Sequence, residues 1–398
     1  MPHLRQSARN MDANPESLPA AADPTRPSLA RHLLRSAPVI VALALLGSLV
    51  QHLGWLRTFE TAALDTALRL KAPLQPSFVQ VVGITESDYR EIFAGRSPLA
   101  QNKVLELIDA IAKGGPERIV VDIDTSEWVE PVNLKDVVGD VPVVWARELE
   151  EVAQALHPRP VFPGASPPVS FGAATFPIDW DGVIRRYRRV FHTTEGPMAS
   201  LAWAAVPGHE REDAGTHVDE DLTLNFTGDQ WDLQPLPASH VLKAAQGPAW
   251  PSSVLKGKTV IVGGVYRAAR DTYFTPLGPF SGVQLVALAI ESERQNRGIR
   301  PVNEVKMFLI ELLGAFGIAA LHFVLRPALA FWVSLAAIPL LTLAGSLVAF
   351  SAFAYWVSFV PAFFGTLLDQ LYERTKEHLR LRRELESLRA QVAAFAAS

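Results

Sequence analysis

Residues 328–368 form the longest stretch of the chain without a charged side chain. At about 1.5 Å of rise per residue, a single helix of this length would be about twice the ~30 Å thickness of a bilayer's hydrocarbon core. We therefore expect the segment to lie in lipid and to fold back once. The small residues Gly345, Ser346 and Ser351 predict the turn, which gives two transmembrane helices within 327–370.

Two other apolar segments flank a long mixed region. Residues 38–56 predict a transmembrane anchor over 35–56, and residues 307–325 predict a further transmembrane helix over 304–326. Arg326 and Pro327 end the latter helix, because proline stops a helix and arginine favours the membrane surface. A cleaved signal peptide is the alternative for 38–56, but the segment lies far from Met1 and no small-x-small pair follows it, so we favour an uncleaved anchor.

The basic residues near these four segments predict their orientation, because cytoplasmic flanks carry an excess of Lys and Arg. One topology, with both chain ends cytoplasmic and 57–303 outside, agrees with Arg31, Arg35, Arg326, Arg374, Lys376, Arg380, Arg382 and Arg383. Four basic residues just before the second span oppose it, but they belong to a long translocated region in which charge has little effect: Arg294, Arg297, Arg300 and Lys306.

The regions on either side of the anchor differ in pattern. Residues 1–34 contain five prolines and no apolar periodicity, which predicts a disordered cytoplasmic tail. Residues 57–303 alternate between helical and strand patterns and predict one α/β domain. Its expected strands are 78–84, 118–123, 141–145, 183–191, 222–226 and 259–263, and its expected helices are 59–70, 99–112, 199–206, 240–245 and 283–297.

Two details of this domain follow from spacing. The order of strand 78–84, helix 99–112 and strand 118–123 predicts a parallel pairing of the two strands. Residues 157–168 contain five prolines and are expected to form a loop without regular structure.

Composition narrows the class of protein. Hydrophobic residues make up 49% of the 398 residues and the mean hydropathy is +0.15, as expected for a membrane protein that carries one sizeable water-soluble domain. The net charge of −4 gives no basic excess for nucleic acid, so we exclude a nucleic-acid partner. The chain has no cysteine, which excludes disulfides, a thiolate nucleophile and Cys-ligated metal sites.

After the last span, residues 371–398 predict a cytoplasmic coiled coil. Six of eight positions on a 3-4 alternation are apolar: Leu371, Arg374, His378, Leu381, Leu385, Leu388, Val392 and Phe395. We assign oligomerisation, with a dimer favoured, to Leu381, Leu385, Leu388 and Val392. The alternative is a single amphipathic helix lying on the bilayer, but four glutamates balance the arginines and weaken attraction to anionic lipid.

Five stretches of 57–303 follow one another in an order that belongs to a known family: ALDTALRLKAP, VVDIDTSE, GAATFPIDWDGVIRRYRRVF, LTLNFTG and LKGKTVIVGGVYRAARDTYFTPLGPFSGVQLVALAIES. In this order the region resembles the second type of CHASE domain, the extracytoplasmic sensor of bacterial cyclases and histidine kinases. The resemblance implies one anchor, a sensor domain, three closely spaced spans and a cytoplasmic output.

Two motifs in this region are candidates for ligand binding. Asp122 and Asp124, on alternate residues at a strand end, could ligate a hard cation, although an ordinary strand end explains them as well. The Gly263-Gly264 turn with Arg267, Arg270 and Asp271 could bind an anion. The competing interpretation is a structural ion pair between Arg270 and Asp271.

Other charged residues have weaker candidate roles. Arg185, Arg186, Arg188 and Arg189 alternate faces on a strand, so we expect them to be solvated. Glu311 is an intramembrane carboxylate, which is costly in lipid; either it makes a functional contact or it reaches water near the outer surface. No catalytic signature or metal-ligand spacing is present, so we expect no enzyme activity, metal or cofactor.

The expected fold is thus an α/β extracytoplasmic sensor domain between one N-terminal and three C-terminal transmembrane helices, ending in a short coiled coil. The expected function is a non-catalytic sensor in the bacterial inner membrane that detects a small ligand or a periplasmic partner. No output domain follows the coil, so a separate cytoplasmic effector protein is expected, or the chain is a fragment. The alternatives are a structural or membrane-acting oligomeric subunit and a periplasmic-side enzyme.

Overall fold

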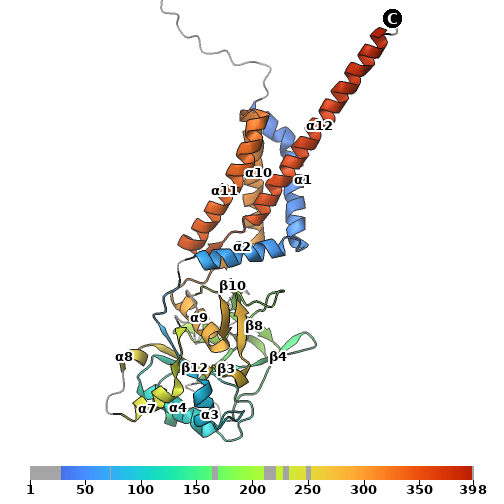
Figure 1. Ribbon diagram of the computed structural model, residues 1–398. Coiled ribbons are helices and arrows are strands. Elements are labelled where there is room, and N and C mark those ends of the chain that lie inside the picture. The colour runs from blue at the N-terminus through green and yellow to red at the C-terminus, as the bar shows by residue number, and fades with distance from the viewer. Residues whose placement is uncertain are drawn as a thin grey trace, which may run out of the picture.

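A computed structural model describes residues 28–71, 73–163, 169–209, 221–226, 233–247 and 252–396. Figure 1 shows a bundle of helices at one end of the molecule, an α/β domain at the other end, and one helix lying between them. Most of the predicted tail lies outside the described residues. Its boundary at residue 34 is wrong, however, because helix α1 (Leu29–His52) begins at Leu29, where the Ser28 hydroxyl accepts a hydrogen bond from the Arg31 N–H.

The α/β domain is organised around a six-stranded sheet with the order β11-β1-β12-β2-β3-β6, in which all neighbours are parallel. Its strands are β1 (Val79–Ile84), β2 (Arg118–Asp122), β3 (Val143–Arg147), β6 (Val169–Ala173), β11 (Leu236–Pro237) and β12 (Thr259–Gly264). The predicted direct pairing of β1 with β2 is wrong. The later strand β12, whose first five residues are all buried, lies between them.

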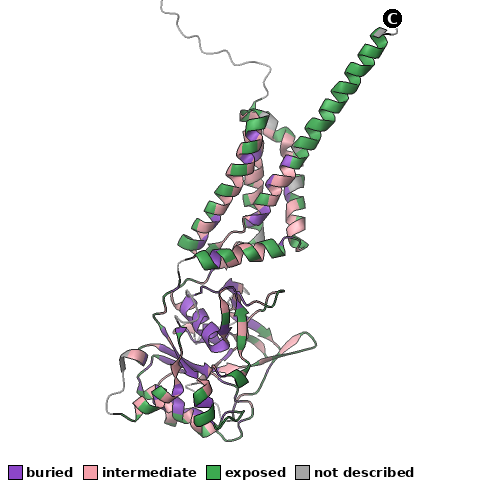
Figure 2. Cartoon of the chain, viewed as in Figure 1, coloured by how far each residue is buried: buried purple, intermediate pink, exposed green. Residues whose placement is uncertain are grey.

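Helices cover both faces of the sheet, which confirms the expected α/β fold. Helices α4 (Gln101–Lys113) and α7 (Ala238–Ala245) pack on one face, and α6 (Leu201–Ala204) and α9 (Gly282–Arg294) on the other. Successive strand residues point to opposite faces, so Val120 belongs to one core whereas Ile119 and Val121 belong to the other. Figure 2 shows the sheet and α9 as the most buried parts of the molecule.

Short elements complete the domain. The short helices are α3 (Glu86–Glu91), α5 (Leu134–Val138), α8 (Ser252–Leu255) and η4 (Arg267–Ala269). Four two-stranded ribbons pair β4 (Leu149–Val152) with β5 (Ala155–Pro158), β7 (Arg186–Arg188) with β10 (Asp221–Thr223), β8 (Val190–Thr193) with β9 (Gly196–Ala199), and β13 (Thr272–Thr275) with β14 (Gly278–Ser281). The predicted strand 183–191 therefore breaks in two, because β7 and β8 have different partners. The predicted proline loop begins within β5, and residues 164–168 lie outside the described part.

The bundle contains α1, α10 (Glu304–Val324), α11 (Pro327–Phe353) and α12 (Val360–Ala396). Among the described residues, three helices are long and apolar enough to cross a membrane: Leu29–His52, Val305–Val324 and Ala328–Phe353. The predicted turn at Gly345 to Ser351 is wrong, because α11 continues to Phe353 and ends where Ala354 takes a left-handed conformation. The Ser346 hydroxyl does not break the helix; it donates to the Val357 carbonyl in the turn that follows.

Helix α12 differs from the other three because charged residues begin at Asp369, soon after its start. Its first part packs against α1, α10 and α11, where the buried Gln370 side chain donates to the Ser334 hydroxyl. The rest projects beyond the bundle and is exposed along its length (Figure 2). A fourth membrane crossing by α12 stays a prediction.

Two features join the domain to the bundle. Helix α2 (Arg57–Leu70) follows α1 and lies across the end of the bundle, between it and the domain (Figure 1). The two-residue strand β15 (Arg300–Pro301), where the chain leaves the domain, pairs with β16 (Tyr355–Trp356) in the turn between α11 and α12. The exit of the domain is therefore hydrogen-bonded to the segment that leads into α12.

Candidate functional site

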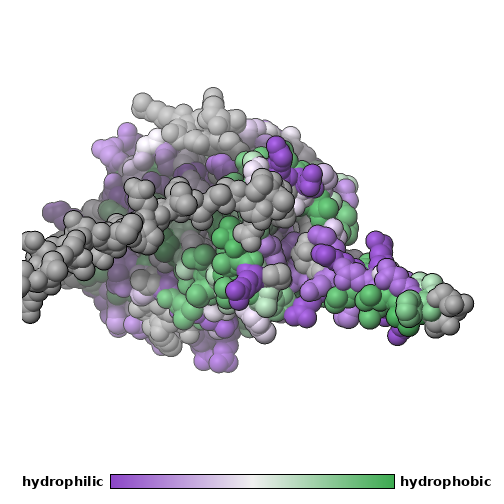
Figure 3. Space-filling model, turned by 90° about the horizontal axis from the view of Figure 1, so that it is seen from above, coloured by the Kyte–Doolittle hydropathy of each residue, from purple (hydrophilic) through white to green (hydrophobic). Residues whose placement is uncertain are grey.

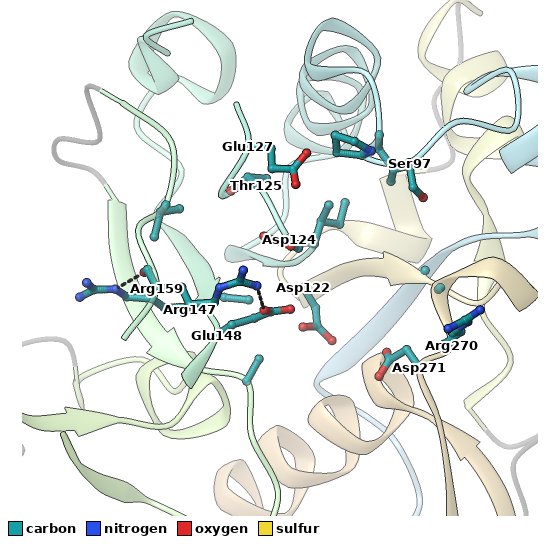
Figure 4. Close-up of a pocket in the computed structure, with 18 of the residues that line it drawn as sticks. Ser97, Asp122, Asp124, Thr125, Glu127, Arg147, Glu148, Arg159, Arg270 and Asp271 are labelled. Atoms are coloured by element: carbon teal, nitrogen blue, oxygen red, sulfur yellow. Dashed lines mark hydrogen bonds and ion pairs between the residues drawn. The ribbon is translucent and has the colours of Figure 1, made fainter. Parts of the chain in front are cut away.

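A cavity of about 580 Å³ opens at the carboxyl edge of the parallel sheet. Asp122, Arg147 and Gly264, the last residues of β2, β3 and β12, form part of its wall. This is the edge at which open parallel α/β sheets bind ligands, because the loops that follow the strands converge there. Figure 4 shows the polar side chains that surround the cavity.

Two carboxylates from different elements face each other in this cavity. Asp122 ends β2 and Asp271 precedes β13, and Figure 4 shows their carboxylates pointing toward one another. Burial raises the pKa of Asp122 to about 8, and the charges of Asp271 and Glu148 add to the increase. No described residue forms a hydrogen bond with the Asp122 side chain.

Asp271 is held in place more firmly. Burial raises its pKa, while the nearby Tyr273 hydroxyl and Gly282 N–H favour the charged form; the Gly282 N–H donates to the Asp271 backbone carbonyl at 3.0 Å. Burial and the charge of Asp271 in turn raise the pKa of Tyr273 to about 12. Gly282 leaves the room that this carboxylate needs, because a Cβ atom at that position would overlap Asp271 Oδ2.

The arginines around the cavity do not neutralise this pair. Arg147 donates to both carboxylate oxygens of Glu195, at 2.9 and 3.1 Å, and Arg159 donates to Glu148 at 2.9 Å. Arg270 is exposed, with a left-handed φ of 53°, and points away from Asp271 in Figure 4. The expected Arg270–Asp271 ion pair is therefore wrong, because the left-handed turn at Arg270 separates the two side chains.

The described lining of the cavity is acidic and contains one buried hydroxyl without a partner. Five carboxylates line it against three guanidiniums: Asp122, Asp124, Glu127, Glu148 and Asp271 against Arg147, Arg159 and Arg270. Thr125 also lines it; this residue is 2% exposed, and its Oγ1 has no hydrogen-bond partner. Buried polar groups are usually hydrogen-bonded, so an orphan hydroxyl at a cavity wall marks a position for a ligand atom or a water.

The structure brings together three of the four ligand-binding residues expected from the sequence. Asp124, Arg270 and Asp271 line the cavity, whereas Arg267 does not; its side chain is exposed and its N–H donates to Glu86 Oε2 at 3.1 Å. The nearby glycine pair serves packing: a Cβ atom at Gly263 would lie 3.0 Å from the Asp122 carbonyl oxygen.

Three residues of the cavity lining were not predicted from the sequence: Arg147, Glu148 and Thr125. The signal was available for Arg147, since it ends a predicted strand of the same parallel sheet as Asp122. The expected cation site at Asp122 and Asp124 gains no support, because no three or more His, Cys, Asp or Glu side chains among the described residues are placed to hold a metal ion.

A second charged cluster lies at the junction with the membrane bundle. Arg185 is 2% exposed and donates to Asp65 of α2 at 2.6 Å, to Asp179 at 2.9 Å and to Asp181 at 2.8 Å. The expectation that the arginines at 185–189 are solvated is wrong for Arg185, since these three carboxylates provide its countercharge in the interior. It is also wrong for Arg189, which pairs with Glu293.

The remaining predicted residues lie in the bundle and in α12. Glu311 is on α10, and its Oε1 is buried without a hydrogen-bond partner. The side chains assigned to oligomerisation are all exposed in the single chain, from 51% at Leu381, 54% at Leu385 and 55% at Leu388 to 68% at Val392. The roles of these residues stay predictions.

A comparison with protein-family models matches residues 39–324 to the CHASE2 domain. The chain belongs to the CHASE2 family. The match extends from α1 through the α/β domain to the end of α10, and confirms the resemblance deduced from the five sequence stretches. CHASE2 is a family of sensory domains, and its match together with three apolar helices identifies a membrane protein with a sensor-type domain. No curated protein and no solved structure proved similar to the chain.

Proposed function

We propose that this CHASE2 protein is a non-catalytic sensor of the bacterial inner membrane, with its α/β domain outside and both chain ends in the cytoplasm. A ligand in the cavity at the carboxyl edge of the sheet is the cue, and a change in α12 is the output. The observation that carries the proposal is the pairing of β15 with β16, which hydrogen-bonds the exit of the domain to the turn that leads into α12.

A second set of contacts supports the proposed transmission from the α/β domain to the helix bundle. The Arg185 cluster fixes α2 to the domain through Asp65, and α2 also reaches the bundle through Glu60. Glu60 Oε1 accepts from Gln51 of α1 at 3.0 Å and from Ser358, beside β16, at 3.5 Å. A movement of the loops around the cavity therefore has two connected paths to the helices.

The proposed output is a parallel coiled coil with a second copy of the chain. Figure 3 shows hydrophobic atoms along one side of the projecting part of α12 and hydrophilic atoms along the other. An apolar stripe at 3-4 spacing on an otherwise charged helix is the pattern of a two-stranded seam. A separate cytoplasmic effector protein then reads the register or crossing of the two α12 helices.

A larger structural assembly is the second candidate, and one observation favours it. A Cβ atom at Gly314 or at Gly317 on α10 would meet nothing within 4 Å, so this face is open for close packing against another helix. The mass of the purified protein in detergent separates the candidates. Two chains per particle support the sensor dimer, and a number well above two supports the assembly.

The proposed topology is tested by labelling single cysteines, since the natural chain has none to interfere. In right-side-out vesicles a membrane-impermeant maleimide is expected to label Gly208→Cys in the domain and to leave Ser387→Cys in α12 unlabelled until the membrane is opened. Labelling of both variants from the same side contradicts the proposal, because the domain and the coil then share a compartment.

A further inference from the structure

The cavity described above has an unusual charge arrangement. Carboxylates in a protein interior are normally paired or hydrogen-bonded, because an isolated buried charge is costly. The Asp122 carboxylate, half-buried at the cavity wall, has neither kind of partner among the described residues, and it faces a second half-buried carboxylate, Asp271. The cavity therefore lacks a positive charge at the point where Asp122 and Asp271 meet.

The neighbouring cations do not supply that charge. Arg147 is engaged by Glu195 and Arg159 by Glu148, while Arg270 points away from the pair. Asp124 and Glu127, on the loop after β2, add two further carboxylates to the wall.

Two observations exclude the simplest cation, a bare metal ion, as the best fit. No set of three or more metal-ligating His, Cys, Asp or Glu side chains is present in the described ranges. The cavity of about 580 Å³ also has the size of a small-molecule site, which typically measures about 300–1,000 Å³.

The hydroxyl of Thr125 gives an independent indication of a ligand. It is buried at the cavity wall without a hydrogen-bond partner, and a hydroxyl can both donate and accept. Tyr266, stacked on Tyr89 with ring centroids 4.1 Å apart, lines the same cavity. A site with acidic, hydroxyl and aromatic groups suits an organic cation that also carries a polar group.

We infer that the cavity binds a small organic cation, with an ammonium or guanidinium group between Asp122 and Asp271 and a polar group near Thr125. This ligand class rests on the proposed sensor function, because it identifies the cue for that same site. The bound cation supplies the countercharge that the two carboxylates lack, so binding and the placement of the loops around the cavity are coupled.

The test is calorimetric titration of the purified full-length chain in detergent with 1,4-diaminobutane. The matched probes are 1,4-butanediol, which has the same length without charge, succinate, which has the opposite charge, and calcium chloride. We expect the diamine alone to bind, Asp122→Asn and Asp271→Asn each to weaken binding at least about tenfold, and Thr125→Val to weaken it less. Asp109→Asn, the same change on the exposed face of α4, is the control and is expected to bind normally.

The pH dependence of binding provides a readout that a purely structural role would not give. Because burial raises the pKa of Asp122 to about 8, a larger fraction of this side chain is ionised at pH 8.5 than at pH 7, so diamine affinity is expected to rise several-fold between these pH values. Asp122→Asn is expected to remove this rise. The variant leaves the other titratable groups at the wall unchanged: Asp124, Glu127, Glu148, Tyr266, Asp271 and Tyr273.

Several results overturn the inference. They are equal binding of the diol, preferential binding of succinate, binding of calcium alone, and diamine binding that survives both aspartate substitutions. The proposed function fails separately: diamine binding with no change in the arrangement of α12 keeps the cation site and rejects the signalling route.

Discussion

The cavity and the Arg185 cluster at the junction with the bundle contain the same kinds of side chain, aspartate and arginine, in opposite arrangements. At the junction, three aspartates surround one buried arginine, so every charge has a partner within 3 Å. In the cavity, Asp122 and Asp271 face each other without an arginine between them. A cluster in which every buried charge has a countercharge holds two parts of a fold together. A cluster that lacks a countercharge costs stability and leaves a position for a ligand.

Burial also affects the pKa values of the two sites differently, as Arg185 and Asp122 show. For Arg185, burial alone lowers the pKa, but hydrogen bonds to Asp65, Asp181 and Asp179 outweigh it and raise the pKa above its ordinary value. For Asp122, burial and the neighbouring carboxylates both raise the pKa, so nothing compensates for the cost of the charge. Substitutions at the two sites should therefore change stability in opposite directions.

The largest expected effect is at the junction. Arg185→Met leaves Asp65, Asp179 and Asp181 without their countercharge, which should destabilise the domain by about 3–5 kcal/mol. Thermal unfolding of the purified chain measures it. Arg188→Met, a change of the same type at a residue whose side chain is 34% exposed, should cost at most about 1 kcal/mol. Equal losses of unfolding free energy in the two variants would show that the ion pairs of Arg185 stabilise the domain no more than those of the partly exposed Arg188.

The next effect concerns the placement of Asp271. In Gly282→Ala the new methyl group overlaps the Asp271 carboxylate, so the side chain or helix α9 must shift, at a cost of about 1–3 kcal/mol. Gly317→Ala, where a Cβ atom meets nothing within 4 Å, is the control. Unchanged unfolding in Gly282→Ala would mean that Asp271 is not fixed at this position.

A gain of stability is expected at Asp122, and it depends on pH. Its pKa in the folded chain is about 8 against an ordinary 3.8, so between those values the folded chain holds a proton that the unfolded chain releases. Wild-type stability therefore falls as pH rises from 4 to 8, and Asp122→Asn removes this loss. We expect equal melting temperatures near pH 4 and a variant that melts higher at pH 8.5, by about 2–4 °C for each kcal/mol of the loss that the substitution removes. A variant that is less stable than the wild type at both pH values would contradict this, because the Asp122 carboxylate would then stabilise the fold.

The smallest effect is expected at Arg270. Arg270→Asn keeps a residue that tolerates the left-handed backbone and removes an exposed charge, so unfolding should change by less than about 0.5 kcal/mol. Because a cation near the cavity opposes a cationic ligand, affinity for 1,4-diaminobutane should rise about twofold to fivefold. A loss of diamine affinity would contradict this, since Arg270 would then assist binding.

The sequence predicted the parts of this molecule that depend on local pattern. Strand β12 and helix α9 are found close to where apolar periodicity placed them, and the five family stretches led to the matched family. Three of the cavity's acidic residues were also named, because carboxylates at strand ends and beside glycine turns are visible in one chain: Asp122, Asp124 and Asp271.

The features that the sequence did not reveal depend on distant partners or on the local backbone conformation. Arg185 looked solvated because its alternation on a strand does not show Asp65, which lies 120 positions earlier. The Arg270–Asp271 pair failed for a backbone reason, the left-handed conformation of Arg270. The turn between α11 and α12 was misplaced because small polar residues such as Ser346 satisfy their hydrogen bonds without ending a helix.

The most direct test of the account is whether occupation of the cavity changes the separation of two α12 helices. A spin label on Ser387→Cys, an exposed position of α12 outside the apolar seam, reports this separation by pulsed electron paramagnetic resonance in the full chain reconstituted into lipid nanodiscs. We expect one short distance whose distribution shifts when 1,4-diaminobutane is added, and no shift when Asp122→Asn and Asp271→Asn are combined. Identical distributions with and without the diamine, in a chain that binds it, would contradict the claim that the cavity signals through α12.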